Sequence, residues 1–470
     1  MKDAPLGIVL AAGLGTRMRS QTPKVMHTAA GRPLLSHILA TLDELGARPL
    51  VVLSRESAPA RSLLSNGARV AMQDPPRGTG DAVRVALAAT KEAGGTALIV
   101  YGDTPLVRAE TLRHLIRLRE TRGAVLALLS GDVGTDNAYG RVVRDSAGDV
   151  ARVIEARLAT ADEKALPESN LGAYAADLAW LRGAVGKLKA NATGEIFLTD
   201  LVALATGEGE KVAVHKAADP EEGRGVNTRV ELAAVEDVLR KRIRERHMLA
   251  GVTFHDPGSS LVDADVELAP DVVIERGSIL EGKTKVGART RVGPYSILRD
   301  ATVGANCRVE ASVLEGATLE DGVRIGPFSH LRPGAYLEQG VEMGNYGEVK
   351  AARLGAGTKM HHFGYIGDAS VGKRVNIGAG TITMNYTAKR TKERTEIGDD
   401  AFIGSDSLLR APLRVGKGAI TGGGSVVTKD VPDGTIAVGM PARAIGKVEP
   451  AAKPKPAKRA AAKSAPAKRR

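Results

Sequence analysis

Aliphatic residues recur at every sixth position through much of the second half of the chain. They stand at Val262, Leu268, Ile274, Leu280, Val286, Val292 and Leu298, and after a slip at Ile325, Leu331, Leu337, Met343 and Val349, then at Ile397, Ile403, Leu409, Val415 and Val427. Six is not a helical period. It fits a solenoid in which about eighteen residues form each coil of three short strands, and each strand points one aliphatic side chain inward. Stacked coils then bury side chains that a single coil leaves exposed.

The six-residue period breaks between Thr383 and Ile397, where the segment NYTAKRTKERTE is polar and cationic. An insertion in a solenoid forms a loop that projects outward, often on the binding face. We therefore expect such a loop here. The period by itself leaves open a purely architectural solenoid.

The first half of the chain alternates short apolar runs with amphipathic segments. Strands are expected at residues 7–11, 50–54, 70–73, 97–101 and 125–130, and helices at 33–45, 81–93 and 109–122. This alternation predicts a mostly parallel sheet that is covered by helices on both faces. Ligands of such sheets bind at the carboxyl ends of the strands. Residues 227–251 then form a single charged helix that connects the two halves.

The stretch IVLAAGLGTRM, from Ile8 to Met18, lies at one of these strand ends. Glycine has no Cβ and tolerates positive φ, so Gly13 and Gly15 would allow successive backbone N–H groups to converge on a phosphate. The same two glycines also fit a tight turn between a strand and a helix. The motif alone leaves both interpretations open.

The net charge of +12 does not indicate specific nucleic-acid binding, because eight basic residues and no acid lie in the Ala/Lys/Pro-rich segment 450–470. We expect this segment to be a disordered appendage. The chain has one cysteine, Cys307, so an intrachain disulfide is impossible and a cytoplasmic location is expected. No apolar stretch approaches the roughly 20 residues of a membrane span, so membrane insertion is not expected.

Several further motifs accompany the opening loop. They are Pro23-Lys24, Gln73 with Gly78-Thr79-Gly80, Tyr101-Gly102-Asp103, Tyr139-Gly140-Arg141, Gly194-Glu195 ahead of Leu198-Thr199-Asp200, Gly225-Val226-Asn227, Leu331-Arg332-Pro333-Gly334, and Asn376 within VNIGAGTITMNY. Together with the hexapeptide solenoid, they resemble the bacterial bifunctional N-acetylglucosamine-1-phosphate uridyltransferase/glucosamine-1-phosphate N-acetyltransferase family. The resemblance runs from Gly7 to about Gly446.

This resemblance implies an α/β chain with four parts. They are a Rossmann-like uridyltransferase domain at 1–229, a linker helix at 230–250, a left-handed parallel β-helix acetyltransferase domain at 251–447, and a disordered tail at 448–470. The enzyme would acetylate glucosamine 1-phosphate with acetyl-CoA. It would then transfer UMP from UTP, with Mg²⁺, to give UDP-N-acetylglucosamine and pyrophosphate. The product would supply peptidoglycan and lipopolysaccharide synthesis.

In the first domain, the resemblance implies a substrate site made of Leu10, Ala11, Ala12, Gly13, Lys24, Gln73, Gly78, Thr79, Tyr101, Gly102, Asp103, Gly140, Glu155, Asn170 and Asn227. Arg17 would face the leaving pyrophosphate and Lys24 the reacting phosphates, as catalytic residues. Asp103 and Asn227 would bind Mg²⁺, although Asp103 also fits a turn. The family often has a polar residue where this chain has Leu14.

In the second domain, the resemblance implies that Arg332, Lys350, Tyr365, Asn376 and Lys392 bind glucosamine 1-phosphate, and that Ala379, Asn385, Tyr386, Ser405, Gly423 and Arg443 bind acetyl-CoA. His362 would be the catalytic base that takes a proton from the amine, with His361 as a surface residue. Glu348 would orient the sugar or the base. The chain would form a homotrimer in which Lys392 reaches the site from a neighbouring copy. Met440 stands where relatives often have arginine, and Arg443 lies close enough to replace it.

Two alternative functions remain open on the sequence. One is a single-function nucleotidyltransferase whose solenoid only oligomerises or regulates. The other is a nucleic-acid-binding scaffold that depends on the basic tail.

Overall fold

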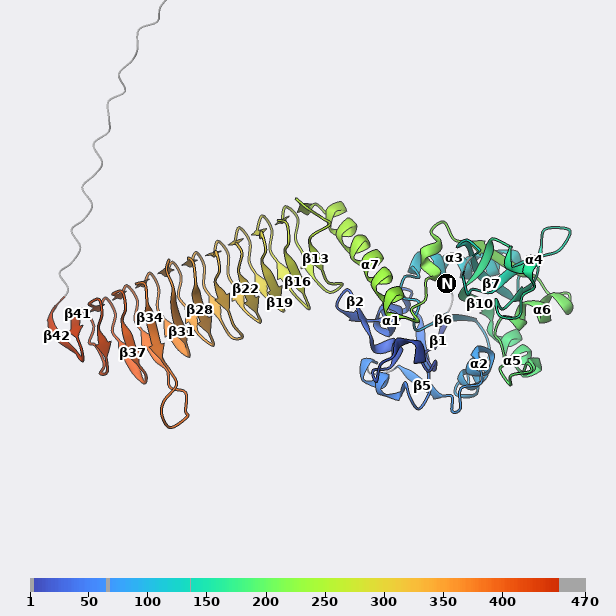
Figure 1. Cartoon of the computed structure of the whole chain (residues 1–470), viewed down its shortest axis with the longest axis horizontal. Coiled ribbons are helices and arrows are strands. Elements are labelled where there is room, and N and C mark those ends of the chain that lie inside the picture. Colours follow the sequence, from blue (N-terminus) through green and yellow to red (C-terminus); the bar gives the residue numbers. More distant parts are fainter. Residues whose placement is uncertain (1–3, 65–67, 136, 448–470) are drawn as a thin grey trace, which may run out of the picture. The chain divides into compact units, whose positions relative to one another are not determined.

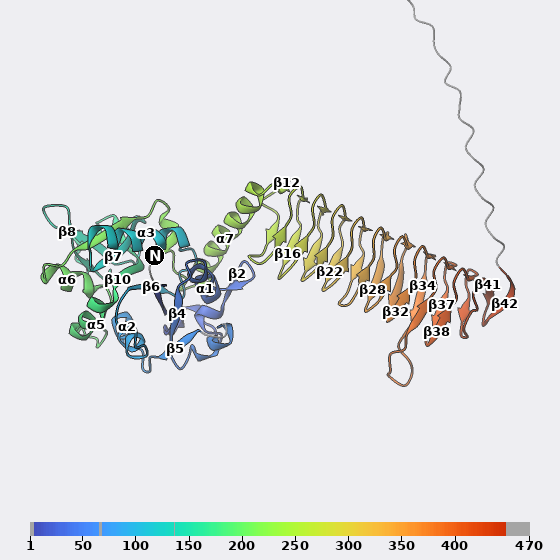
Figure 2. The same cartoon turned by 180° about the vertical axis from the view of Figure 1, so that it is seen from behind.

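The computed structural model describes residues 4–64, 68–135 and 137–447, so the predicted disordered tail lies outside the described residues. The chain divides into two compact units (Figures 1 and 2). One unit ends at Leu249 and also takes in Leu261–Val266, which include β13 (Leu261–Val262). The other comprises Ala250–Ser260 and the chain from Glu267 onward. Among the described residues, no helix is long and apolar enough to cross a membrane.

The first unit is built on a sheet with the strand order β11-β7-β10-β6-β1-β4-β5. These strands are β1 (Leu6–Leu10), β4 (Arg48–Leu53), β5 (Arg69–Met72), β6 (Thr96–Tyr101), β7 (Leu126–Asp132), β10 (Glu168–Asp177) and β11 (Val212–Lys216). The predicted strands are present and their mutual contacts are parallel. The unpredicted β10 lies between β6 and β7 and is antiparallel to both. Shorter strands are β2 (Thr28–Ala29), β3 (Arg32–Pro33), β8 (Arg141–Arg144) and β9 (Val150–Ile154).

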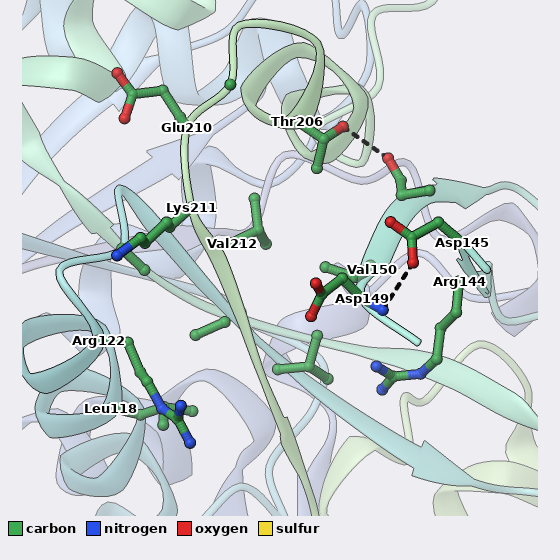
Figure 3. Close-up of a pocket in the computed structure, with 15 residues that line it drawn as sticks. Leu118, Arg122, Arg144, Asp145, Asp149, Val150, Thr206, Glu210, Lys211 and Val212 are labelled. Carbon is green, nitrogen blue, oxygen red and sulfur yellow. Dashed lines mark hydrogen bonds between the residues drawn. The ribbon is translucent and has the colours of Figure 1, made fainter. Parts of the chain in front are cut away.

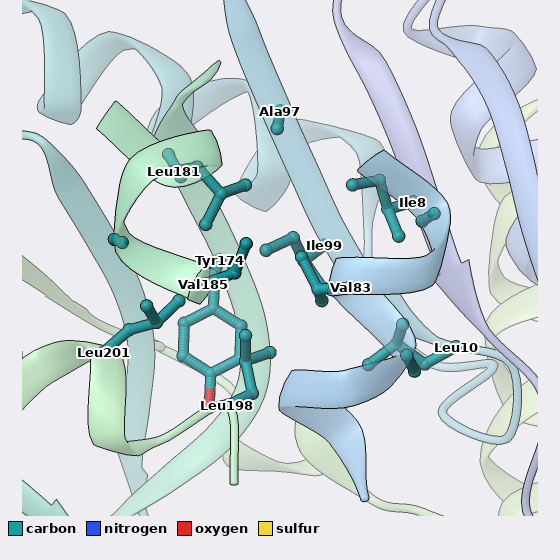
Figure 4. Packing of buried hydrophobic residues seen from close by; sticks show 14 of the residues in the cluster. Ile8, Leu10, Val83, Ala97, Ile99, Tyr174, Leu181, Val185, Leu198 and Leu201 are labelled. Atoms are coloured by element: carbon teal, nitrogen blue, oxygen red, sulfur yellow. The ribbon is translucent and has the colours of Figure 1, made fainter. Parts of the chain in front are cut away.

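Helices cover both faces of this sheet because successive residues along its strands place apolar side chains on opposite faces. Along β1, Leu6, Ile8 and Leu10 enter one core cluster, whereas Val9 enters the other. The first cluster packs under α2 (Thr79–Ala88), α5 (Leu178–Lys187) and α6 (Asp200–Gly207), as Figure 4 shows. The second packs under α1 (Leu34–Glu44) and α3 (Ala109–Arg122). The short helices are α4 (Ala161–Lys164), η1 (Thr16–Met18), η2 (Lys24–Met26), η3 (Ala58–Leu63) and η4 (Pro220–Gly223).

Helix α2 ends at Ala88, earlier than the predicted end at residue 93. The guanidinium of Arg182, on α5, donates hydrogen bonds to the carbonyls of Leu87, Thr90 and Glu92 at 2.6–2.9 Å. These bonds satisfy carbonyls that a continued helix would have paired internally. A distant arginine therefore sets the end of α2, which the local sequence does not reveal.

The predicted connecting helix is α7 (Arg229–Leu249). Its buried residues Val235, Leu239, Ile243 and His247 recur every fourth position. That spacing places them on one stripe of an α-helix, and the charged residues between them stay on the other faces.

The second unit is a left-handed parallel β-helix in which every third strand joins the same sheet (Figures 1 and 2). Sheet I consists of β12 (Thr253–Phe254), β15 (Val273–Ile274), β18 (Arg291–Val292), β21 (Arg308–Val309), β24 (Arg324–Ile325), β27 (Glu342–Met343), β30 (Lys359–Met360), β33 (Asn376–Ile377), β36 (Phe402–Ile403), β39 (Ile420–Thr421), β41 (Thr435–Gly439) and β42 (Ala442–Lys447). Sheet II includes β16 (Ile279–Glu281), β19 (Ile297–Arg299), β22 (Val313–Glu315), β25 (His330–Leu331), β28 (Gly347–Lys350), β31 (Gly364–Gly367), β34 (Thr381–Met384), β37 (Leu408–Arg410) and β40 (Val426–Val427). Sheet III consists of β14 (Glu267–Leu268), β17 (Lys285–Val286), β20 (Thr302–Val303), β23 (Thr318–Leu319), β26 (Tyr336–Leu337), β29 (Arg353–Leu354), β32 (Ala369–Val371), β35 (Thr395–Ile397) and β38 (Leu413–Val415).

The periodic aliphatic residues form the interior of the β-helix, as predicted. All of them are buried except Leu268, which is half-buried. The slip after Leu298 does not interrupt the stack, because Leu298 pairs with Leu280 on one side and with Leu314 on the other. Val303 follows Leu298 after five positions and is equally buried. One side of a coil can therefore have five residues instead of six while its inward side chain stays in register with the neighbouring coils.

The predicted outward loop lies between Met384, which ends β34, and Thr395, which begins β35. It folds back on itself through an antiparallel bridge between Tyr386 and Lys392. The N–H of Glu393 donates to the carbonyl of Asn385 at 2.8 Å. Figure 1 shows this loop projecting from the stack of coils.

Candidate active sites

A cavity of about 230 Å³ lies at the carboxyl ends of β1 and β6, where a parallel sheet binds its ligands. Ten of the predicted nucleotide residues line it, namely Leu10, Ala11, Ala12, Gly13, Lys24, Gln73, Gly78, Thr79, Tyr101 and Asp103. Val25, Pro76 and Ala82 complete the wall and were not predicted. The predicted Gly102 does not line the cavity; its N–H donates to the carbonyl of Leu10 at 2.9 Å. Arg17 lies exposed on η1.

The two glycines of the opening loop have different surroundings. A Cβ on Gly13 would meet no atom within 4 Å. Gly15 has a φ of +63°, and a Cβ there would lie 2.8 Å from Cβ of Lys24. Gly15 is therefore required by the fold, because it lets Lys24 pack closely. Gly13 instead leaves space beside the cavity.

We expect Gly15→Ala to lower the stability of the protein and Gly13→Ala to weaken its binding of UTP. Gly15→Ala should lower the melting temperature, because a left-handed backbone costs an L-residue about 1–2 kcal/mol and its Cβ collides with Lys24. Gly13→Ala should leave the melting temperature within about 1 °C and raise the KM for UTP by roughly tenfold. Thermal unfolding and uridylyl-transfer kinetics on both variants measure these effects. A Gly13→Ala protein with an unchanged KM would contradict a ligand beside Gly13.

Gln73 is held in one orientation at the wall of the cavity. Its amide nitrogen Nε2 donates to the carbonyl of Gly78 at 3.0 Å and to Asp81 at 2.9 Å. The amide oxygen is then the group left to accept a hydrogen bond from a base. Asp81, in the motif GTGD, was not predicted to take part. The hydroxyl of the predicted Thr79 accepts the N–H of Leu198 at 3.0 Å.

The two predicted metal ligands converge on one cation. Lys24 Nζ forms an ion pair with Asp103 and donates to Asn227 Oδ1 at 3.1 Å. A carboxylate and an amide oxygen that share one positive charge are a donor set that suits Mg²⁺, which takes one or two protein oxygens beside phosphates and water. The ammonium of Lys24 thus stands in for a cation, and the residues present fit a metal ion. Within the described ranges, no group of three or more His, Cys, Asp and Glu side chains is placed to hold a metal.

The predicted sugar-binding residues lie beside the cavity in a buried hydrogen-bonded network. Thr199 donates to Glu155 Oε1 at 2.8 Å, and burial raises the pKa of Glu155. The pKa of Tyr101, on the cavity wall, is also raised, by burial and then by the Glu155 charge. Asn170 donates its N–H to the carbonyl of Gly140 at 2.8 Å. Tyr101 therefore lies between the predicted sugar-binding residues and the predicted nucleotide-binding residues. Thr199, in the motif LTD, was not predicted to take part.

A larger cavity in this unit lies elsewhere. It encloses about 720 Å³ along the edge strand β11 and the β8–β9 hairpin (Figure 3). None of the predicted site residues lines it, and its lining charges are mixed: Arg122, Arg144 and Lys211 are basic, and Asp145, Asp149 and Glu210 are acidic. Arg144 is already paired with Glu168 at 2.8 Å. Size alone therefore does not identify the active site.

Three of the predicted phosphate-binding cations gather on sheet II. Arg332 and Lys350 occupy neighbouring strands, and Arg332 donates to Glu348 Oε1 at 2.9 Å. The Lys392 ammonium beside Lys350, followed by the Arg332 charge, lowers the pKa of Lys350. Lys392 thus joins the cluster from the loop of its own protomer. The structure describes a single chain, so the predicted reach of Lys392 into the site of a neighbouring copy stays a prediction.

Tyr365, the next residue below Glu348 on sheet II, is tied to the start of the loop. Asn385 Nδ2 donates to Tyr365 Oη at 3.2 Å and also to Asp368. A Cβ on Gly367 would lie 2.1 Å from Tyr365 Oη, so this glycine makes room for the phenol. Asp368 and Gly367 were not predicted; the motif YIGD contains both but does not show that they support Tyr365.

The two histidines at the corner between sheets I and II have different partners. His361 Nε2 lies 2.9 Å from Glu342 Oε2 in an ion pair. No hydrogen bond or ion pair is found for His362 within the part of the chain that the structure describes, and its side chain is exposed. His362 is therefore the histidine that is free to meet a ligand.

His362 is the first of four predicted site residues that lie in one column along the stacked coils. Their positions in the sequence do not reveal this arrangement. The strands before and after this corner pair with the next coil at the same spacing in sequence. Lys359 lies opposite Asn376, and Gly364 lies opposite Thr381. This register places Ala379 directly beneath His362, followed by Ser405 and Gly423 in the next two coils. Three small residues beneath a histidine leave a shallow path along the corner.

The remaining predicted residues are spread out in one protomer. Asn376 lies exposed on sheet I, across the corner from the cation cluster of sheet II. Tyr386 is 63% exposed in the loop, and Met440 is 76% exposed near the end of the helix. Arg443 lies exposed on β42. One copy of the chain thus holds the cation cluster at the end of β31, away from the His362 column at the corner and from Asn376 and Arg443 on sheet I.

Comparisons with known proteins match both halves of the chain. Residues 7–169 match a MobA-like NTP transferase domain, and residues 394–429 match a hexapeptide repeat of succinyl-transferase. The bifunctional protein GlmU of Alkalilimnicola ehrlichii is 45% identical over 447 residues, covering 94% of this chain and 96% of that one. Its counterpart in Streptococcus thermophilus is 41% identical over 434 residues, covering 92% and 94%.

The chain belongs to the GlmU family of bifunctional proteins. A further GlmU relative, from an Exiguobacterium species, is 40% identical over 433 residues, covering 92% of this chain and 96% of the relative. Membership in the GlmU family confirms the predicted pair of activities, uridylyl transfer and N-acetylation in UDP-N-acetylglucosamine synthesis. A GlmU-type nucleotidyltransferase site also implies a divalent metal ion.

Proposed function

We propose that the cavity at β1 and β6 transfers UMP from UTP to N-acetylglucosamine 1-phosphate, and that sheet II with the His362 column acetylates glucosamine 1-phosphate. The observation that carries the first assignment is the convergence of Gly13, Lys24 and Asp103 on one cavity at strand ends. The second rests on the cation cluster around Lys350. The product would supply cell-wall precursors.

At the first site, the chain mainly binds and aligns two anions. Lys24 places positive charge beside the reacting phosphates, and Arg17 faces the leaving pyrophosphate. Gln73 accepts a hydrogen bond from uracil, and Glu155 from the sugar hydroxyls. Asp103 and Asn227 would hold Mg²⁺, which supplies positive charge that stabilises the phosphates in transfer.

At the second site, Arg332, Lys350 and Lys392 bind the sugar phosphate. Their mutual repulsion is relieved by an anion, so the cluster favours a phosphate. His362 accepts the proton that the amine loses as it attacks the thioester carbonyl, and coenzyme A leaves as the thiol. Tyr365 and Asn385 lie at the edge of this cluster and orient the sugar, with the pantetheine arm along Ala379, Ser405 and Gly423.

Assays of both half-reactions on the full chain test this function. With UTP, Mg²⁺ and N-acetylglucosamine 1-phosphate we expect pyrophosphate release, and with acetyl-CoA and glucosamine 1-phosphate we expect thiol release. Release of pyrophosphate without thiol release would support the single-function nucleotidyltransferase instead. Removal of residues 448–470 should change neither rate.

The proposed assembly is a homotrimer, and the outer face of sheet II supports it. Its outward residues Ile279, Ile297 and Val313 are apolar, whereas the matching positions on sheet I are Arg291, Arg308 and Arg324. A row of exposed aromatic residues follows the adjoining corner, at Tyr295, Phe328, Tyr346 and Phe363, which are 57–64% exposed. Aligned apolar surface of this kind marks an interface between proteins. Hexapeptide-repeat domains often form trimers.

In this assembly, one site would combine His362 of one copy with the cation cluster of another. Within a single copy, Lys350 pairs opposite Gly367 at the end of β31, whereas His362 lies at the corner before β31 begins. Asn376, on the opposite side of the corner, would likewise meet the cluster of the next copy.

Mixing inactive His362→Ala chains with inactive Lys392→Ala chains should therefore restore acetyltransferase activity. In a mixed trimer, one interface combines an intact His362 with an intact Lys392. Random mixing should recover on the order of a tenth or more of wild-type activity, measured as thiol release after joint refolding. Mixed trimers, verified by mass spectrometry, that stay inactive would place His362 and Lys392 in the site of a single copy.

The location and boundaries of the parts are also proposals. A cytoplasmic location follows from the substrates UTP and acetyl-CoA and from the single Cys307, which is a free thiol. We propose that residues 1–229 form the uridyltransferase domain, 230–250 the linker helix and 251–447 the acetyltransferase domain.

A further inference from the structure

One lysine occupies the position that the metal ion of the first site would take. Lys24 Nζ contacts Asp103 and Asn227 at once, and its side chain is only 12% exposed. The three residues come from η2, from the turn after β6 and from the start of α7. A surface lysine that merely balances charge would not be enclosed by oxygen donors from two other segments of the chain.

The two oxygen donors are fixed by the backbone, whereas Lys24 is the movable partner. The N–H of Val226 donates to the carbonyl of Asp103 at 2.9 Å, which ties the two donor segments together. The N–H of Asn227 donates to Glu231 Oε2 at 2.7 Å. Lysine carries its ammonium on a flexible four-carbon stem. The close approach that Gly15 permits is to Cβ of Lys24. It constrains the base of the side chain and not its ammonium end.

We propose that Lys24 fills the cation position in the free protein and leaves it when nucleotide phosphates bind. This inference rests on the proposed role of Asp103 and Asn227 as metal ligands. An ammonium and a metal ion cannot occupy the same space between these oxygens. Lys24 also lines the cavity, so phosphates that enter it offer the ammonium a new partner. Metal and nucleotide should consequently bind with positive coupling, and the coupling is reciprocal.

Titration of the full chain with Mn²⁺ alone, without nucleotide, tests the proposal by calorimetry and by the electron paramagnetic resonance of free Mn²⁺. Lys24→Met should bind Mn²⁺ at least about tenfold more tightly than the wild type, because the competing ammonium is gone. Lys24→Gln should behave in the same way. Lys24→Arg, which keeps the charge and much of the reach, should stay within about threefold of the wild type.

Arg17→Met is the matched control for general charge, since Arg17 belongs to the same loop but is exposed. It should change Mn²⁺ affinity by less than about threefold, because solvent and salt screen it. An equal tightening by Arg17→Met and Lys24→Met would overturn the proposal. So would an unchanged affinity in both Lys24→Met and Lys24→Gln, with melting temperatures close to wild type.

Asp103→Ala separates this inference from the function on which it rests. If Asp103→Ala removes Mn²⁺ binding while the lysine variants bind no more tightly, the metal site stands and the role of Lys24 is refuted. If Mn²⁺ still binds to Asp103→Ala with wild-type affinity, the metal assignment itself fails. The expected result is loss of binding in Asp103→Ala and in the double variant with Lys24→Met.

Discussion

Replacement of Asp103 by alanine is expected to abolish uridylyl transfer, by about 10³-fold or more, and to leave acetyl transfer within twofold of the wild type. Within the described residues, Asp103 is the only carboxylate that pairs with the Lys24 ammonium, and its loss removes both that partner and the proposed metal ligand. Loss of preorganised charge stabilisation at a reacting centre typically costs 10²- to 10³-fold, and here two contributions disappear together. The acetyl-transfer residues lie in the other compact unit.

The measurement is the initial rate of pyrophosphate release and of thiol release on the same preparation. Asp132→Ala is a suitable control, because Asp132 pairs with Lys216 at 2.8 Å at the exposed end of β7 and does not line the cavity. Both rates should be unchanged in that control. Parallel loss of both activities in a folded Asp103→Ala protein would show that the two sites are not independent.

His362→Ala should lower the kcat of acetyl transfer by about 10²- to 10⁴-fold, the usual contribution of a general base. The KM for glucosamine 1-phosphate should change less, since the cations of sheet II bind the phosphate. His361→Ala should stay within roughly tenfold of the wild type, a barrier change of about 1.4 kcal/mol, because His361 is held by Glu342. Wild-type kcat/KM should fall at acid pH as the substrate amine gains a proton and loses its nucleophilic lone pair.

Steady-state kinetics of both histidine variants with acetyl-CoA measure these effects, together with the oligomeric state of each. A loss in His361→Ala as large as the loss in His362→Ala would refute the assignment.

Much of the fold follows from local sequence patterns. The spacing of residues such as Leu280 and Val292 is enough to define a β-helix, because one period sets both the strand length and the inward side chain. Strand β10 could not be predicted in the same way. Its sequence ESNLGAYAAD has a glycine at φ +77° in the middle and a register shift between Asn170 and Tyr174, so its apolar pattern does not alternate regularly.

The candidate sites depend on contacts between distant residues, which local patterns do not contain. Asn227 meets Lys24 only because α7 begins beside η2, and no spacing in the sequence relates them. Lys392 lies beside Lys350 of the same chain because its loop folds back, and its position in an insertion gives no sign of that neighbour. The column from His362 to Gly423 is hidden for a similar reason, since the loop separates Ala379 from Ser405 in sequence but not in the stack.

The regular stacking of this column sets distances along the corner of the β-helix in fixed steps. Neighbouring strands lie about 4.8 Å apart, so three steps from His362 to Gly423 span about 14 Å. The length of a groove on such a surface changes only in whole increments of one coil. Adding or removing a coil below His362 would therefore alter which linear acyl carrier fits, while the residues around His362 stay where they are. Specificity for carrier length and chemistry at the amine can thus vary independently in a protein built this way.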